Sequence, residues 1–276
     1  MKSRLLVAAV CVPVLFIILF FLPAYVFAAV ISLICAISSY EFQHSIGHKG
    51  NERIAIYATF SAALIPIGAY FDVGALVFQA VLLILMCLMF IEAIIAHNSK
   101  RPVSFAQVLV ALFGGTAISY LLSDLVSLRN LPEGRLFVLL PIISAFVTDA
   151  GAYFTGLLFG KKKAFPLISP KKTVEGCIGG ILTGVAAMVI YGIVIEYVTF
   201  YDVRFWELTL YGLLGAVLSE LGDIAFSLIK REYKVKDYGR LLPGHGGILD
   251  RFDSMVFTAP AILLLTSVIP AIFVNA

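Results

Sequence analysis

The chain has 276 residues, of which 61% are apolar and 13% are charged, with a formal net charge of +3. Its mean hydropathy is +1.01, whereas soluble domains average roughly 45–50% apolar and about 25% charged residues, which excludes an ordinary water-soluble globular protein. This length leaves room for about nine transmembrane helices of about 20 residues with short loops. We therefore predict an all-α, polytopic integral membrane helical bundle.

Apolar windows and their flanks predict nine membrane spans. They run over residues 5–21, 24–40, 54–71, 74–96, 104–127, 136–159, 176–200, 205–229 and 252–274. The first two spans turn near Leu22-Pro23 and could instead form a re-entrant pair. A cleavable secretory signal ending near Ala28 is the other interpretation of the N-terminus, but the apolar run continues to about Ser39, which favours two consecutive helices.

The Lys and Arg residues are distributed very unevenly between the two sets of loops. Of the 20, the loops on the N-terminal side hold 17 and the opposite loops hold three. The positive-inside rule then predicts a cytosolic N-terminus and a C-terminus across the membrane. The two richest loops, 160–175 and 230–251, would both face the cytosol, where nucleotides are found. Attraction to anionic lipid headgroups is the alternative explanation of these charges, and we favour it for Lys100 and Arg101.

Carboxylates within or at the edge of spans are costly and mark candidate functional positions. They are Glu92, Asp124, Asp149, Glu196, Glu220, Asp223, Asp250 and Asp253. Those nearest the span ends, Glu92, Asp124 and Glu196, are explained by snorkelling or a local hydrogen bond. Asp149 lies in mid-span among small and hydroxylated residues, so it should face the bundle interior or a polar cavity. Interhelical hydrogen bonding and a role in a site are equally open for it.

The densest group of polar residues runs from Asp223 to Asp253. On a helix, Asp223, Ser227 and Lys230 fall at i, i+4 and i+7 and share one face, and Asp250 and Asp253 share a face at i and i+3. Carboxylates that converge from different helices offer the hard oxygen ligands of Mg²⁺, which leaves coordination positions for substrate phosphates. Neighbouring lysines and arginines would neutralise phosphate charge during a transfer reaction.

The loop between these carboxylates contains Pro243-Gly244-His245-Gly246-Gly247. Its glycines can adopt positive φ and present backbone N–H groups, as in the nests that hold anions. A plain turn between helices is the alternative. The many flanking charges favour the anion-binding interpretation.

The segment from Ser227 to Asp253 reads SLIKREYKVKDYGRLLPGHGGILDRFD. It resembles the signature of the phosphatidate cytidylyltransferase family at every position of that pattern. The upstream run from Ile168 to Gly176, with Gly160-Lys161 before it, looks like the family's second recurrent block. The resemblance covers roughly residues 140–260. We accordingly expect an N-terminal transmembrane region, 1–135, of about five spans and a C-terminal catalytic transmembrane region, 136–276.

The resemblance implies transfer of a cytidylyl group from CTP to phosphatidic acid, which gives CDP-diacylglycerol and pyrophosphate in phospholipid biosynthesis. It implies Mg²⁺ as cofactor, and a second cation is open. The catalytic residues implied are Asp223, Asp250, Asp253, Lys230, Arg231 and His245. The substrate-binding residues implied are Ser169, Lys171, Lys172, Thr173, Ser227, Lys236, Asp237, Gly246, Gly247 and Arg251. The metal ligands implied are Asp223, Asp250 and Asp253, with Asp149 and Glu175 as further candidates for the metal or for supporting the loop lysines.

Two other functions deserve comparison with this one. A transporter should place its charged groups near the bilayer midplane in broken helices of two related halves, whereas here they gather toward one face and no half repeats the other. A CDP-archaeol synthase or a polyprenol kinase would share the need for nucleotide, Mg²⁺ and anionic lipid, but the complete signature favours the diacylglycerol enzyme. We expect a multi-pass protein of the bilayer (the inner membrane in a bacterium), a cytosol-facing active site, no nucleic-acid partner and, from the general frequency of two-fold assemblies, a homodimer.

Overall fold

The computed structural model describes residues 13–47, 52–99, 102–199, 201–241, 244 and 246–274. Within these ranges, eight helical segments are long and apolar enough to cross a membrane. They are Ala24–Ile46, Glu52–Tyr70, Gly74–Ala96, Phe105–Asn130, Gly134–Phe159, Val174–Val198, Phe205–Glu232 and Leu249–Val268. They correspond to eight of the nine predicted spans, so the all-α, polytopic class is confirmed. The span predicted at 5–21 begins outside the described residues and stays a prediction.

The chain divides into two compact units. Unit 1 comprises residues 1–135 and 232–252, and unit 2 comprises residues 136–231 and 253–276. The 27-residue signature segment is therefore shared, because its middle belongs to unit 1 and its two ends to unit 2. The assignment of catalysis to residues 136–276 as one region stays a prediction.

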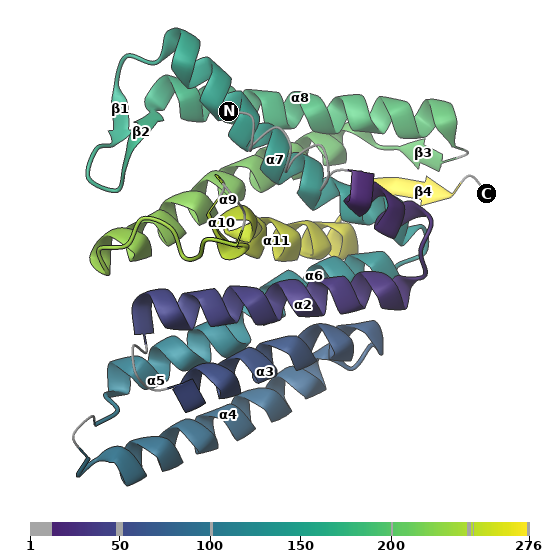
Figure 1. Ribbon diagram of the computed structural model, residues 1–276. Coiled ribbons are helices and arrows are strands. Elements are labelled where there is room, and N and C mark those ends of the chain that lie inside the picture. The colour runs from purple at the N-terminus through teal and green to yellow at the C-terminus, as the bar shows by residue number, and fades with distance from the viewer. Residues whose placement is uncertain are drawn as a thin grey trace. The chain divides into compact units, whose positions relative to one another are not determined.

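Unit 1 is a helical bundle built around α3 (Figure 1). Its elements are α2 (Ala24–Phe42), η1 (Gln43–Gly47), α3 (Glu52–Tyr70), α4 (Gly74–Ala96), α5 (Phe105–Leu112), η2 (Phe113–Ala117), α6 (Ile118–Asn130) and the short α10 (Leu249–Phe252). Helix α3 packs against α2, α4 and α6, and α10 packs against α2. Ile54 and Ala58 of α3 form a buried core with Leu85 and Met89 of α4 and Val108 of α5.

Two segments of unit 1, η1 and η2, are π-helical and directly continue α2 and α5. Gln43, at the start of η1, is fully buried and donates its side-chain N–H to the carbonyl of Val110, 3.2 Å away. Gly114 of η2 lies so close to Phe42 and Gln43 that a Cβ there would be 2.7 Å from each. Such π-helical turns are rare and occur frequently at functional sites. Because of η1, the first fully described span reaches Ile46 rather than ending near residue 40.

Unit 2 holds the longest helices of the chain. Its elements are α7 (Gly134–Phe159), β1 (Lys163–Phe165), β2 (Ser169–Thr173), α8 (Val174–Val198), β3 (Tyr201–Val203), α9 (Phe205–Glu232), α11 (Met255–Val268) and β4 (Ile272–Val274). Strands β1 and β2 form an antiparallel hairpin between α7 and α8. Small residues bring the helices together: a Cβ on Gly184 of α8 would lie 2.4 Å from Thr148 of α7 and 3.0 Å from Ala216 of α9. Close approach at small residues is typical of helix packing in membranes.

The C-terminal boundary of the last predicted span, 252–274, is wrong. Helix α11 ends at Val268, and residues 272–274 form β4, which pairs with β3 in an antiparallel register of Tyr201 with Val274. The cause is Pro270, because the residue before a proline is driven away from helical φ and ψ. Ile269 accordingly has φ −134° and ψ 70°.

Candidate active site

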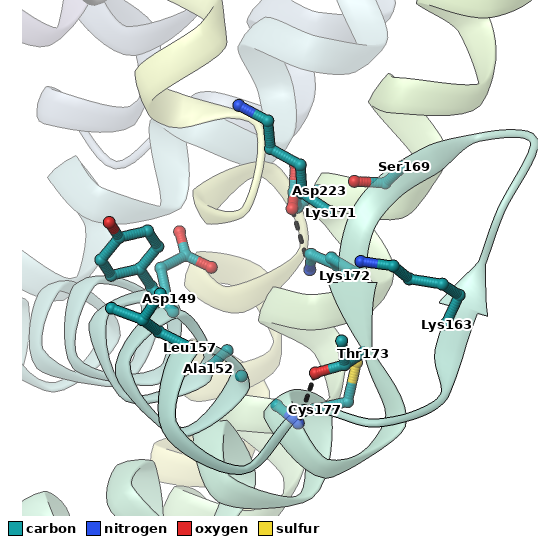
Figure 2. Close-up of a pocket in the computed structure, with 14 residues that line it drawn as sticks. Asp149, Ala152, Leu157, Lys163, Ser169, Lys171, Lys172, Thr173, Cys177 and Asp223 are labelled. Atoms are coloured by element: carbon teal, nitrogen blue, oxygen red, sulfur yellow. Dashed lines mark hydrogen bonds and ion pairs between the residues drawn. The ribbon is translucent and has the colours of Figure 1, made fainter.

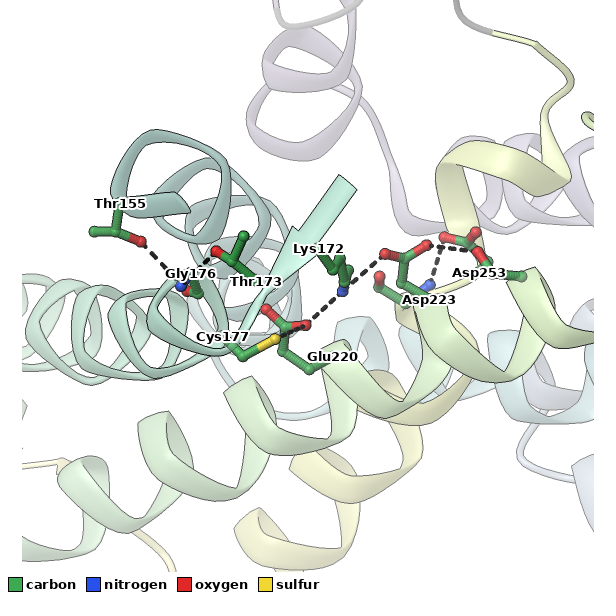
Figure 3. Close-up of polar contacts among 10 residues, drawn as sticks. Thr155, Lys172, Thr173, Gly176, Cys177, Glu220, Asp223 and Asp253 are labelled. Atoms are coloured by element: carbon green, nitrogen blue, oxygen red, sulfur yellow. Dashed lines mark hydrogen bonds and ion pairs between the residues drawn. The ribbon is translucent and has the colours of Figure 1, made fainter. Parts of the chain in front are cut away.

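A buried ion cluster in unit 2 centres on Lys172. The hairpin strand β2 carries Lys172 between two carboxylates of α9, Glu220 and Asp223, which lie at i and i+3 on one face (Figure 3). The ammonium Nζ lies 2.8 Å from Asp223 Oδ2 and also contacts Glu220 Oε2. The Lys172 and Glu220 side chains are only 15% and 7% exposed. One ammonium thus bridges two carboxylates of α9, so with both carboxylates ionised the three side chains together keep an excess negative charge.

The two carboxylates fix the charge state of Lys172. Burial alone disfavours its ammonium form, but the charges of Asp223 and Glu220, together with hydrogen bonds to both, outweigh burial and raise the pKa of Lys172 above its usual value. The side chain therefore stays protonated throughout the physiological pH range. It therefore acts as a fixed ammonium between the two carboxylates rather than as an acid or a base.

The face of α9 predicted from spacing is present in the structure. Ser227 Oγ donates to Asp223 Oδ1 at 3.5 Å, and one turn further along Lys230 Nζ lies 3.9 Å from Asp253 Oδ2. The Lys230 and Asp253 side chains are 9% and 8% exposed, so this second ion pair is also buried. Gly222 allows the approach, because a Cβ there would lie only 2.9 Å from the Asp253 carbonyl oxygen.

A cavity of about 480 Å³ opens beside the Lys172 cluster (Figure 2). Asp149 lines one wall and the hairpin lysines Lys163, Lys171 and Lys172 line the other. Its full lining consists of Asp149, Ala152, Tyr153, Gly156, Leu157, Gly160, Lys163, Ser169, Lys171, Lys172, Thr173, Gly176, Cys177 and Asp223. The cavity combines apolar side chains of α7 with the basic hairpin. Asp149 therefore lines a cavity that is partly polar and partly apolar, whereas its mid-span position predicted the bundle interior or a polar cavity.

Two residues of the second recurrent block hold backbone. Glu175, in the first turn of α8, accepts hydrogen bonds from the N–H groups of Lys161 and Lys162 at 3.0 and 3.2 Å. Thr173 is the N-cap of α8 and accepts from the N–H of Gly176 at 3.1 Å. Of the two roles predicted for Glu175, these contacts match the support of the lysine loop.

The signature loop, of which the structure describes residues 238–241, 244 and 246–249, belongs to unit 1 and is followed by a buried carboxylate, Asp250. Asp250 Oδ2 accepts from the N–H groups of Tyr238 and Gly247 at 2.8 and 3.0 Å. Gly244 and Gly246 have φ of 78° and 83°, as expected for loop glycines with positive φ. The N–H of Gly247 is directed at Asp250, so this part of the predicted nest is occupied by the protein's own carboxylate.

The remaining predicted positions are placed as follows. Ser169 and Lys171 line the cavity of unit 2. Arg231 donates from Nε to the carbonyl of Ile168 at 3.0 Å and so ties the end of α9 to the β1–β2 hairpin. Lys236, Asp237 and Arg251 are exposed in unit 1, and His245 lies outside the described residues. The roles of these residues in catalysis stay predictions.

The carboxylates of unit 2 are the candidate ligands for a metal ion. Within the described ranges, no group of three or more His, Cys, Asp or Glu side chains is arranged to hold a metal ion by itself. Asp223 and Asp253 lie beside Lys172 and Lys230, with N–O distances of 2.8 and 3.9 Å. Mg²⁺ is usually held by one or two carboxylates and completes its shell with water and substrate phosphates. The donor set fits an ion that binds together with a phosphate-bearing substrate.

Two carboxylates that are buried in the structure, Glu220 and Glu41, were not predicted from the sequence to have a role in the site. Glu220 was noted as a carboxylate in a span, but its partner, Lys172, is 48 residues away and spacing could not reveal the pair. Its Oε1 is buried and has no hydrogen-bond partner among the described residues. Glu41 lies in unit 1 and is 7% exposed, although it was placed just outside a span. Ser38 and Ser39 precede it, and their polar side chains lower the local hydropathy, so the predicted span ends near residue 40 although the helical segment continues to Ile46.

The fold and the site together define a polytopic membrane protein with a basic, partly apolar cavity suited to a phosphate-bearing ligand. The family description "Cytidylyltransferase family" matches residues 2–269, nearly the whole chain. The chain belongs to this cytidylyltransferase family.

Relatives in three bacteria carry the name phosphatidate cytidylyltransferase. The protein of Staphylococcus saprophyticus is 35% identical over 194 residues, which are 70% of this chain and 72% of the relative. The protein of Bacillus subtilis is 39% identical over 171 residues, 60% of this chain and 61% of the relative. The protein of Staphylococcus haemolyticus is 42% identical over 133 residues, 48% of this chain and 50% of the relative.

Proposed function

We propose that this protein is a phosphatidate cytidylyltransferase, which transfers CMP from CTP to phosphatidic acid and releases pyrophosphate. Its membership of the cytidylyltransferase family and relatives of that name at 35–42% identity support the reaction. The observation that carries the proposal is the basic cavity of unit 2, where hairpin lysines face the apolar side chains of α7. A lipid with a phosphate headgroup needs basic side chains for its phosphate and apolar side chains for its acyl chains.

The chemistry requires no covalent intermediate on the protein. A phosphate oxygen of phosphatidic acid attacks the α-phosphorus of CTP, a new P–O bond forms, and the bond to the β-phosphate breaks with pyrophosphate as leaving group. Two polyanions must meet, so positioning and charge neutralisation supply most of the rate. We assign charge neutralisation to Lys171, Lys172, Lys230, Arg231, Lys236 and Arg251, and the orientation of substrate oxygens to Ser227 and His245.

Lys172 has the most defined role in this proposal. Because Glu220 and Asp223 hold its ammonium in one place and keep it protonated, the charge is already positioned before substrate arrives. A preorganised charge in a site shielded from water stabilises a developing anion more strongly than a mobile one. A phosphate oxygen that approaches from the cavity meets this charge together with Lys171.

We further propose that the reaction depends on Mg²⁺. Asp223 and Asp253 would hold the ion, Asp149 is a supporting candidate, and substrate phosphates would complete its coordination. Bound Mg²⁺ would polarise phosphoryl oxygens and offset charge on the leaving pyrophosphate. Asp250 is a weaker candidate, because its Oδ2 already accepts two backbone N–H groups.

Topology and assembly complete the proposal. The excess of Lys and Arg in one set of loops supports a cytosolic N-terminus and a cytosol-facing active site. A homodimer is proposed from the general frequency of two-fold assemblies alone.

The test is pyrophosphate release by purified protein in detergent with CTP, phosphatidic acid and Mg²⁺, next to controls that lack the lipid or contain EDTA. Release that needs all three, with CDP-diacylglycerol on thin-layer chromatography, is the expected result. Phosphorylation of a polyprenol, with a nucleoside diphosphate rather than pyrophosphate as the second product, would replace this function with that of another lipid-activating enzyme.

A further inference from the structure

Glu41 is a carboxylate in an unusual position for a membrane helix. It is the penultimate residue of α2, which continues directly into the π-helical η1, and it is 7% exposed. A buried carboxylate in a span is costly unless it is hydrogen-bonded, so its partners indicate why it is there. Those partners belong to the signature loop of the same unit, about 200 residues later in the chain.

Three described residues of the loop, Gly239, Gly247 and Leu249, lie close to the Glu41 carboxylate. Oε2 accepts from the N–H of Leu249 at 3.0 Å. A Cβ on Gly239 would lie 2.0 Å from Oε1, and a Cβ on Gly247 would lie 2.3 Å from Oε2. Real Cβ atoms do not approach that closely, so a side chain at either position would force the Glu41 carboxylate to move.

The residues beside Glu41 support the same loop. Phe42 packs against Tyr238 with ring centroids 5.6 Å apart, and Tyr238 is only 4% exposed. Tyr238 and Gly247 in turn donate their N–H groups to Asp250. Two buried carboxylates therefore accept hydrogen bonds from the backbone of this segment: Glu41, which lies outside the signature, and Asp250, which lies within it.

We propose that Glu41 is a positioning residue for the nucleotide: it fixes the backbone at Gly239, Gly247 and Leu249, and so holds in place the flanking Lys236 and Arg251, which the proposed function assigns to substrate phosphates. The proposal rests on the phosphatidate cytidylyltransferase function proposed above, in which residues of this loop act on substrate. Glu41 touches loop backbone and no reacting atom. Because the lipid phosphate is proposed to bind in the cavity of unit 2, loss of Glu41 should weaken nucleotide binding more than lipid binding.

The experiment compares the full-length protein with Glu41→Ala, Glu41→Gln and the control Glu92→Ala. Glu92 is a carboxylate of α4 in the same unit, and it accepts a hydrogen bond from the hydroxyl of Tyr57 at 3.3 Å. Glu41→Ala should raise the KM for CTP about tenfold or more, the effect expected for a lost hydrogen bond to a buried charge. The KM for phosphatidic acid should stay within twofold. Glu41→Gln keeps an acceptor for Leu249 and should recover most of the loss, while Glu92→Ala should leave the KM for CTP unchanged.

A second set of variants tests the contact with glycine directly. Gly239→Ala should by itself reduce kcat/KM for CTP, because its methyl group would strike the carboxylate. In the double variant Glu41→Ala, Gly239→Ala the obstruction is gone, so the second substitution should add little to the first. Hydrogen exchange should show faster exchange of the 238–249 amides in Glu41→Ala and unchanged exchange in Glu92→Ala.

The outcomes separate the inference from the function on which it rests. Wild-type protein that converts no CTP would overturn the proposed function. Active wild-type protein with an unchanged KM for CTP in Glu41→Ala, or an equal loss toward both substrates, would overturn the role of Glu41 and leave the function standing.

Discussion

Replacement of Lys172 by methionine tests the buried ion cluster. Lys172→Met keeps a long, unbranched side chain, which lacks the terminal ammonium, and so leaves Glu220 and Asp223 together without their cation. Removing one partner of a buried ion pair costs about 3–5 kcal/mol. Lys172 is 15% exposed and Asp223 is 29% exposed, and solvent at these groups reduces the penalty, so we expect about 3 kcal/mol. Turnover should also fall roughly 100-fold, the usual effect of losing one preorganised group that stabilises transition-state charge.

The double variant Lys172→Met, Glu220→Gln separates the two effects. Glu220→Gln removes the most buried negative charge, so apparent thermal stability in detergent should largely return while turnover stays low. The assays are a thermal melt followed by size-exclusion chromatography, and pyrophosphate release. A single variant as stable as wild type would refute the buried ion cluster, and wild-type turnover in the double variant would refute a catalytic role for the ammonium.

Three further predictions concern the proposed metal site, the N-cap of α8 and the membrane topology. Asp253→Asn should abolish pyrophosphate release while the protein still inserts and purifies normally, and substantial retained turnover would remove Asp253 from the proposed metal site. Thr173→Val should lower stability by about 1 kcal/mol through loss of the α8 N-cap, measured as a lower thermal midpoint; an unchanged midpoint would show that the cap contributes nothing. Cysteines placed at Lys100 and Arg204 should react with impermeant reagents from opposite sides of the membrane, whereas labelling from one side would contradict the predicted topology.

The positions of the membrane helices could be predicted from the sequence because their signal is local. Each span needs about 20 apolar residues, and a hydropathy window detects such a run without knowledge of its neighbours. The errors lie where another local rule overrides hydropathy. Residues 269–274 are apolar, but Pro270 ends the helix and the segment pairs with β3. In the same way η1 carries the first fully described span past residue 40 into polar sequence.

The candidate site was predictable only in part, because its contacts join distant segments. Spacing placed Asp223, Ser227 and Lys230 on one helical face, and the structure confirms that arrangement. No periodicity could show that Lys172 lies between Glu220 and Asp223, since the hairpin that delivers it is 48 residues from Glu220. Motif matching also favours residues inside the motif, and so it passed over Glu41.

The structure gives the acidic residues of this chain two different tasks. Asp250 and Glu175 accept two backbone N–H groups each, and Glu41 accepts one, so these three fix the loops that precede helices. Asp223 and Asp253 instead face lysine side chains, although Asp253 also accepts the N–H of Ser254 at 2.8 Å through Oδ1. A lysine ammonium can contact a substrate phosphate while it stays beside its carboxylate, whereas a carboxylate bonded to backbone alone brings no positive charge to the substrate. We therefore expect the reacting phosphates near Lys172 and Lys230, the lysine partners of Asp223 and Asp253.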